Sequence, residues 1–324
     1  MSNLARPTVL RVSLTLVALL AAAVLLGPRP AATESFTTLR EPLDIQDWVS
    51  VKAAEFDDIV PGTEHQLIWA DSSGARTEWA VVYIHGFSGS IGMSRPFVDS
   101  LSARLGANAY MPRMSGHGRP PEVFGDATLA GWVQDTADAV EIGSRLGEKL
   151  LLVGLSNGAA LSYWAATHEE LGSKIDALVV LSPHLEPADP LSEILLWPWG
   201  TQIAEMVTGE TRNWESYNEA HSTYTTNGYP TKVLAELMGT VKLLRQQDPA
   251  AITAPVLMIY SAGDTVVDIP VALSFFERIQ TRKHLVEVGD VGDPNNHVIV
   301  GEALSPENTV PTVSHILAFL NASE

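Results

Sequence analysis

The segment Gly154-Leu155-Ser156-Asn157-Gly158 restricts the fold of this chain more than any other part of the sequence. It follows a short apolar run at residues 149–153 and precedes a stretch rich in Ala and Leu at residues 159–171. Glycines two positions before and two after Ser156 allow a turn so tight that a Cβ there would clash with neighbouring backbone. The segment therefore predicts a buried strand, a sharp turn and a helix, with the Ser156 hydroxyl exposed at the end of the strand. The alternative, an ordinary serine in a glycine turn, is disfavoured by the matching context on both sides.

The rest of the sequence alternates short apolar runs, many of them rich in β-branched residues, with segments of helical spacing. This alternation predicts an α/β fold with a mostly parallel, doubly wound sheet and right-handed crossovers. The predicted strands are residues 49–56, 65–69, 79–84, 107–111, 149–154, 175–181, 256–260 and 284–288. The predicted helices are residues 96–105, 129–146, 159–171 and 312–320.

Composition narrows the class of protein. The chain has 324 residues, of which 46% are hydrophobic, which suits one large α/β domain, with or without an insertion, and excludes a mostly disordered chain. A net charge of −18 argues against nucleic acid as the main partner, because a phosphate backbone would be repelled. The chain has no Cys, which excludes disulfides, thiolate catalysis and Cys-ligated zinc. It also has no His-x-x-x-His and no carboxylate cluster with ligand spacing, so we expect no metal and no cofactor.

Residues 1–32 have the pattern of a targeting segment. Two arginines precede an uncharged run at residues 12–27, and a Pro-Arg-Pro segment ends it. As a helix this run spans about 24 Å, which is shorter than a bilayer core of about 30 Å. The pattern is typical of a signal peptide or a signal anchor, so cleavage after Ala32 and membrane attachment through residues 4–27 both stay open. In either case the rest of the chain is expected outside the cytoplasm, in the periplasm or the extracellular space.

Residues 185–254 break the alternation, because they contain no strand-like core run. The segment is too long for a plain loop in a compact domain, so we predict an insertion with its own helices. The predicted organisation is a core made of residues 33–184 and 255–324, with a helical cap, or lid, between them. Leu, Trp and Tyr side chains are frequent in the cap. They fit two interpretations equally well: ordinary packing, or the apolar lining of a binding site.

The candidate catalytic residues follow the ends of the predicted strands. A serine hydroxyl is a weak nucleophile without a base, and His297, just after the last predicted strand, is the candidate base for Ser156. Asp264 follows the strand at residues 256–260 and is the candidate that would orient the imidazole. Ser156, Asp264 and His297 also have the chain order expected for a serine in this strand–turn–helix context.

Other acidic residues near these positions have simpler roles. Asp268 directly precedes a helix that begins near Pro270, and a capping role suits it. Asp290 and Asp293 lie closer to His297 in the sequence but are typical turn residues.

Two backbone N–H groups are needed to stabilise the negative charge that develops when a serine attacks a carbonyl group. Asn157, directly after the serine, supplies the first. Phe87, in the Gly-rich loop after residues 79–84, is the candidate for the second, although that loop could also be a simple turn.

Several short segments together resemble the α/β-hydrolase superfamily: His85-Gly86-Phe87, Met114-Ser115-Gly116-His117-Gly118, the segment around Ser156, Gly263-Asp264 and Asn296-His297-Val298-Ile299. The resemblance covers residues 78–320 and is greatest to the lysophospholipase, monoacylglycerol lipase and carboxylesterase branch, which is also classed with the serine aminopeptidases. It implies an α/β-hydrolase fold with a helical cap. It also implies a catalytic triad of Ser156, Asp264 and His297, with oxyanion donors at Phe87 and Asn157. Asn157 departs from the Met or Gln common in that branch, which a backbone donor tolerates.

The leading hypothesis is a serine hydrolase that cleaves carboxylic esters through an acyl-enzyme. A mono-acyl ester or a lysolipid is the expected small-molecule substrate, because the cap is rich in Leu, Trp and Tyr. An amide hydrolase or aminopeptidase is the alternative, and it needs a cap carboxylate to hold the substrate amine. The candidates are Glu193, Glu205, Glu210, Glu215 and Glu219. A non-catalytic binding protein on the same fold is the third hypothesis, but such proteins usually lack a triad member, and all three are present here.

Overall fold

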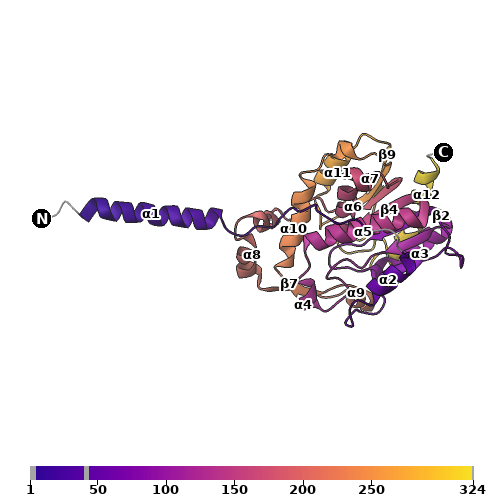
Figure 1. Cartoon of the computed structure of the whole chain (residues 1–324), viewed down its shortest axis with the longest axis horizontal. Coiled ribbons are helices and arrows are strands. Elements are labelled where there is room, and N and C mark those ends of the chain that lie inside the picture. The colour runs from indigo at the N-terminus through magenta and orange to yellow at the C-terminus, as the bar shows by residue number, and fades with distance from the viewer. Residues whose placement is uncertain (1–4, 40–43, 323–324) are drawn as a thin grey trace.

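The computed structural model describes residues 5–39 and 44–322, with side chains from residue 11 onward. Its centre is a seven-stranded sheet in the order β1-β3-β2-β4-β5-β8-β9 (Figure 1). The strands are β1 (Gln66–Ile68), β2 (Thr77–Ile84), β3 (Asn108–Met111), β4 (Gly147–Leu155), β5 (Ala177–Leu181), β8 (Val256–Ser261) and β9 (Lys283–Val288). All neighbours pair in parallel except β1, which runs antiparallel to β3. The predicted mostly parallel sheet is therefore confirmed.

Helices cover both faces of this sheet (Figure 1). They are α2 (Ile45–Ala53), α3 (Ile91–Leu105), α4 (Pro121–Phe124), α5 (Leu129–Leu146), α6 (Asn157–Thr167), α7 (Glu169–Gly172), α11 (Ile269–Glu277), the 3-10 turn η3 (Pro306–Asn308) and α12 (Thr309–Asn321). Side chains along each strand alternate between two apolar layers, as the period of a strand requires. In β2, Ala80, Val82 and Ile84 face the layer formed with α5, α6 and α11, whereas Val81 and Tyr83 face the layer formed with α3 and α12. The sheet is thus doubly wound.

Residues 185–254 form a group of short elements between the neighbouring strands β5 and β8. The elements are η1 (Pro190–Leu196), α8 (Gly200–Thr208), β6 (Thr211–Asn213), α9 (Glu219–Tyr224), β7 (Gly228–Pro230), α10 (Val233–Leu244) and η2 (Pro249–Ala251). The antiparallel pair β6–β7 was not expected from the sequence. The group has a small core of its own, in which Leu195 and Ala204 pack with Met238 and Val241. We keep the name cap for residues 185–254.

Two predicted elements differ from the structure. Residues 49–56 were predicted as a strand, but α2 covers most of this range. Its apolar residues Ile45, Trp48 and Val49 have helical spacing, and the Asp44 side chain caps the helix by accepting from the N–H of Asp47 at 2.9 Å. The helix predicted at residues 159–171 is divided into α6 and α7 by His168, whose backbone is extended.

The N-terminal helix α1 (Ala5–Leu25) projects away from the rest of the molecule (Figure 1). Its described side chains, from residue 11 on, are all exposed. Among the helices searched, which include only described residues, none is long and apolar enough to cross a membrane.

After α1 the chain returns along the body as an extended segment, residues 28–39, which we call the strap. Trp199 N–H and Lys242 Nζ of the cap donate to peptide carbonyls of the strap at 3.1 and 3.0 Å. In the core, Gln134 of α5 exchanges two hydrogen bonds with the backbone of Thr37, both at 2.8 Å. The strap therefore binds the cap and the core at the same time.

Candidate active site

Ser156 lies directly after β4, where the chain turns into α6. Its backbone has φ 56° and ψ −117°, a strained conformation for a residue with a Cβ. Close packing enforces the turn. A Cβ at Gly158 would lie 2.2 Å from the carbonyl oxygen of Ile84, and one at Gly154 would lie 2.5 Å from that of Gly158. Both glycines are therefore required by the backbone around them, as the sequence predicts.

Ser156, Asp264 and His297 meet at the carboxyl edge of the sheet. His297 Nε2 lies 2.8 Å from Ser156 Oγ, and His297 Nδ1 lies 2.7 Å from Asp264 Oδ2. The other carboxylate oxygen of Asp264 accepts from the N–H groups of Val266 and Val267 at 2.8 and 3.1 Å. The Asp264 side chain has no exposed surface and His297 is 7% exposed. With its Nδ1–H donated to the carboxylate, the neutral imidazole is left with Nε2 to accept the Ser156 hydroxyl proton.

Two of the other aspartates have the simple roles expected of them. Asp268 caps α11 by accepting from the N–H of Val271 at 3.0 Å. Asp290 accepts from the N–H of Gly292 at 2.9 Å in an exposed turn. Asp264 is therefore the aspartate in contact with the His297 ring.

Asp293 is a turn residue, as predicted, but it has a larger role than the sequence indicates. It is 2% exposed, and its Oδ2 accepts from the N–H groups of His297 and Val298 at 3.1 and 2.8 Å. Its Oδ1 accepts from the N–H of Asn295 at 3.2 Å. Asn296, between these donors, has a left-handed backbone with φ 53°. Asp293 thus holds the constrained loop from which the His297 ring projects.

The predicted oxyanion donors lie on either side of Ser156. Asn157 begins α6, where the first N–H groups of a helix have no partner within it. Phe87 lies in the loop after β2, and Gly86 brings this loop close to the nucleophile, since a Cβ at Gly86 would lie 3.1 Å from the Ser156 Cβ. Within residues 5–39 and 44–322, the N–H groups of Phe87 and Asn157 donate to no other protein group. Both predicted donors therefore lack a protein partner, in the turn that carries Ser156 and in the loop next to it.

Two buried histidines brace the loop that carries Phe87. His85 Nε2 accepts from the N–H of Met114, and His117 Nε2 accepts from the N–H of Ser88, both at 3.2 Å. The two rings touch, with centroids 4.8 Å apart. Burial lowers the pKa of His85 to about 4 and that of His117 well below its ordinary value, so both rings are neutral and able to accept. Sequence motifs place these histidines near the site without a role, and the contacts show that they join the loops after β2 and β3.

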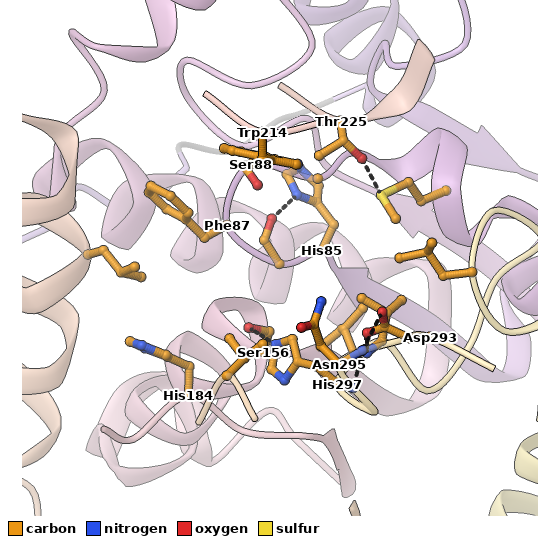
Figure 2. Close-up of a pocket in the computed structure, with 18 of the residues that line it drawn as sticks. His85, Phe87, Ser88, Ser156, His184, Trp214, Thr225, Asp293, Asn295 and His297 are labelled. Carbon is orange, nitrogen blue, oxygen red and sulfur yellow. Dashed lines mark hydrogen bonds between the residues drawn. The ribbon is translucent and has the colours of Figure 1, made fainter. Parts of the chain in front are cut away.

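A cavity of about 720 Å³ lies over Ser156 and His297 (Figure 2). Part of its lining is apolar and comes from the cap: Leu195, Trp214, Tyr229, Leu234, Leu237 and Met238. Trp197 and Trp199, also in the cap, lie on the surface with 56% and 42% of their area exposed. Trp214 therefore has the lining role, whereas Trp197 and Trp199, being exposed, fit neither interpretation.

His184 is a polar group of this cavity that the sequence did not single out. It follows β5, and its peptide N–H donates to the carbonyl oxygen of Ser156 at 3.1 Å. Its side chain lines the cavity beside Ser156 (Figure 2) and is 4% exposed. Its position after an apolar strand next to the serine strand is the sequence signal that could have found it, because parallel strands end at one edge.

The cap carboxylates required by the aminopeptidase hypothesis do not gather at Ser156. Glu193 pairs with Arg245 at 2.8 Å. Glu215 belongs to the cavity lining but is exposed, whereas Glu205, Glu210 and Glu219 are not part of the lining. In the part of the chain that the structure describes, no group of three or more His, Cys, Asp or Glu side chains could hold a metal ion.

Comparison with known proteins places these features in context. The sequence profile of the family described as serine aminopeptidase, S33 (Hydrolase_4), matches residues 75–290. No curated protein matches the chain. The chain is similar to a solved structure from a study of LipS and LipT, two metagenome-derived lipolytic enzymes, with 21% identity, a TM-score of 0.64 and coverage of 82% of this chain and 99% of that one.

Two monoacylglycerol lipases are similar in structure as well. A soluble variant of monoglyceride lipase from Saccharomyces cerevisiae has 14% identity and a TM-score of 0.62, covering 80% of this chain and 91% of that one. The monoacylglycerol lipase of Paleococcus ferrophilus has 19% identity and a TM-score of 0.58, covering 80% and 98%. At these identities the similarity establishes the fold, which is that of the α/β-hydrolases.

Proposed function

Because the chain belongs to the serine aminopeptidase S33 family of α/β-hydrolases, we propose that it cleaves carboxylic esters with Ser156 as nucleophile, His297 as general base and Asp264 as the residue that orients the imidazole. One observation carries this proposal. A hydrogen-bond chain with distances of 2.7 and 2.8 Å connects a buried carboxylate to a serine hydroxyl beneath a cavity to which the cap contributes apolar side chains. A hydroxyl held in this way loses its proton to the imidazole as it attacks.

The reaction has two halves. Ser156 Oγ attacks the acyl carbon while its proton moves to His297 Nε2, and the N–H groups of Phe87 and Asn157 stabilise the oxyanion. His297 then gives the proton to the leaving alkoxide oxygen, and the alcohol departs from the acyl-enzyme. A water molecule attacks the acyl carbon with His297 as base. The acid leaves as the proton returns to Ser156 Oγ.

The cavity favours a single acyl chain and an ester over an amide. Its volume of about 720 Å³ is in the range that buries a small ligand, and the cap supplies leucine, methionine and aromatic side chains to the lining. An aminopeptidase needs a carboxylate that is protected from water to hold the substrate amine. Glu215 and Asp189, the cap carboxylates in the lining, are both exposed, where an ion pair contributes little. We therefore propose a mono-acyl ester as the substrate class.

Turnover of p-nitrophenyl esters from acetyl to palmitoyl tests the proposal, beside an aminoacyl-p-nitroanilide and the Ser156→Ala variant. We expect ester turnover that falls by about 10⁴-fold or more in the variant, with the chain-length optimum reporting the depth of the cavity. Anilide turnover alone would move the protein to the aminopeptidase hypothesis. If folded protein turns over neither substrate and Ser156 does not react with a fluorophosphonate, the binding-protein hypothesis replaces both.

We also propose that residues 1–32 direct the chain out of the cytoplasm. The support is the arginine-flanked, uncharged run at residues 12–27, which lies mostly in α1, apart from the folded body. N-terminal sequencing of protein from fractionated cells tests this. A first residue just after Ala32 in the exported fraction indicates a cleaved signal peptide, and an intact N-terminus in the membrane fraction indicates an anchor. Intact protein confined to the cytoplasm would refute export.

A further inference from the structure

A second cavity, of about 180 Å³, is lined by α2, α5 and the loop after β3, and it shares no lining residue with the cavity over Ser156. Its volume far exceeds the roughly 10–15 Å³ that a single water molecule needs. The lining includes six charged side chains: Lys52, Glu55, Arg113, Arg119, Asp135 and Asp138. Charges that are partly or wholly removed from water need counter-charges, so the pairing of these six decides what the cavity can hold.

Three of the six charges are already paired. Lys52 forms an ion pair with Glu55 at 3.3 Å, and Arg119 forms one with Asp58 at 2.6 Å. Within residues 5–39 and 44–322, no counter-ion accompanies the other three charged side chains of the lining. The cavity is therefore bordered by one cation and two carboxylates that the protein itself does not neutralise.

Arg113 is the unpaired cation, and it is 4% exposed. Its Nη1 donates to the carbonyl oxygen of His117 at 3.1 Å, whereas Nη2 has no acceptor among the described residues. The enclosed Nε is out of reach of a ligand, but Nη2 is not enclosed, and an anion there pairs with a charge that is spread over the whole guanidinium. Burial lowers the pKa of Arg113, which reflects the cost of keeping this charge away from water. A buried guanidinium without a carboxylate therefore favours an anionic group in the cavity.

The two unpaired carboxylates come from α5, where Asp135 and Asp138 are three positions apart and so lie on one face of the helix. Asp135 accepts from the N–H of Ser115, and Asp138 accepts from Gln134 Nε2 at 2.8 Å. Burial raises the pKa of both carboxyl groups to about 6, so both are mostly ionised at neutral pH. They bring negative charge to the cavity that Arg113 lines, and they favour a cationic group there.

We propose that this cavity binds a small zwitterion of the class of free α-amino acids, with its carboxylate on Arg113 Nη2 and its ammonium group on Asp135 and Asp138. Such a molecule pairs charges of both signs at once. A simple anion would be repelled by the two carboxylates, and a simple cation would be repelled by the guanidinium. An ammonium group has three donors, which is enough to reach both carboxylates. The proposal goes beyond ester hydrolysis and does not depend on it.

Calorimetric titration of the full-length protein with glycine, L-alanine and L-serine tests the proposal. Acetate and ethylammonium are titrated beside them, because each carries only one of the two charges. We expect at least one amino acid to bind with a Kd below about 1 mM. Acetate and ethylammonium should bind at least about tenfold more weakly, since each lacks one set of charge-assisted hydrogen bonds.

Variants assign the binding to this cavity. Arg113→Met should weaken binding of the amino acid by about tenfold or more. Asp138→Asn should weaken the amino acid but not acetate, because it removes a negative charge that repels acetate. Arg119→Met is the matched control: this arginine lines the same cavity but already has Asp58 as its partner, so binding should stay within about twofold of wild type.

Three results would overturn the inference. If none of the three amino acids binds to the wild-type protein at about 50 mM, the cavity holds water only. This result needs no variant, which matters if Arg113→Met does not fold. Equal binding of acetate and the amino acids would make the cavity an anion site. Unchanged binding of the amino acid in Arg113→Met would place it elsewhere in the molecule. None of these measurements involves turnover, so they stand whether or not the protein cleaves esters.

Discussion

Replacing Asp293 by alanine should weaken both stability and catalysis, because its carboxylate holds the loop that carries His297. The carboxylate accepts hydrogen bonds from the N–H groups of Asn295, His297 and Val298, and Asp293 is 2% exposed. Without it, the N–H groups of His297 and Val298 lose a charged partner, and each buried donor left unpaired costs about 1–3 kcal/mol. With the bond from Asn295 included, we expect the free energy of unfolding to fall by about 3–5 kcal/mol.

The effect on activity follows from the distance between His297 and the nucleophile. His297 Nε2 lies 2.8 Å from Ser156 Oγ, and a displacement of about 1 Å at a reacting centre costs about 100-fold in rate. Urea unfolding followed by Trp fluorescence and kcat on a p-nitrophenyl ester measure both effects on one preparation. Asp290→Ala is the matched control, because it removes one exposed hydrogen bond from the same loop and should cost less than about 1 kcal/mol with kcat unchanged. If Asp293→Ala matches this control in both measurements, our account of the loop is wrong.

Three more predictions follow, two from the active site and one from the buried titratable groups of the molecule. Phe87→Pro removes the backbone donor and should lower kcat about 100- to 1000-fold, whereas Phe87→Ala keeps the N–H and should stay within about tenfold, as steady-state kinetics will show. Asp264→Asn should lower kcat by about 10⁴-fold, and a pH–rate profile identical to wild type would contradict its role. The buried groups with shifted pKa values include His65, His85, His117 and His184, all lowered, and Asp135 and Asp138, both raised to about 6. The histidines are neutral in the folded state, so the unfolded chain binds protons first and stability falls as pH drops from about 6.5 towards 4. The two aspartates bind protons first in the folded state, so they raise stability as pH drops from about 6 to 4. The histidines outnumber them, so the net effect is a loss of stability. Urea midpoints should therefore be lower at pH 5 than at pH 7, and a higher midpoint at pH 5 would contradict this balance.

The strands of the core could be predicted from sequence because buried strands consist of consecutive apolar residues. β8 and the part of β4 from Leu150 onward are buried, and their sequences are almost entirely apolar. α2 was predicted as a strand because it is short and its second half, residues 49–53, alternates apolar and polar residues as a strand does. The pair β6–β7 could not be predicted either, because β6 is polar and exposed and exists only through pairing with β7, a segment distant in sequence. Such pairing has no local signal.

In the active site, too, some residues can be predicted from the sequence and others cannot. The positions of Ser156, Asp264 and His297 follow from chain order, since parallel strands deliver the residues after them to one edge of the sheet. The contacts of Asp293 and His184 depend on backbone from elsewhere: Asp293 holds N–H groups of its own loop, and His184 lies beside a strand reached through a crossover. The position of His184 after an apolar strand indicates that it lies at this edge of the sheet, but only the coordinates show that its side chain lines the cavity.

The strap also imposes an order on folding. Residues 28–39 are made before the rest of the folded body, yet their partners Gln134, Lys242 and Gln247 lie 97, 212 and 213 residues further along the chain. The strap can therefore dock only when the core and the cap have both been synthesised. Until then residues 28–39 lack these partners. Docking of the strap would then be a late step of folding, and its resistance to proteases would report when that step is complete.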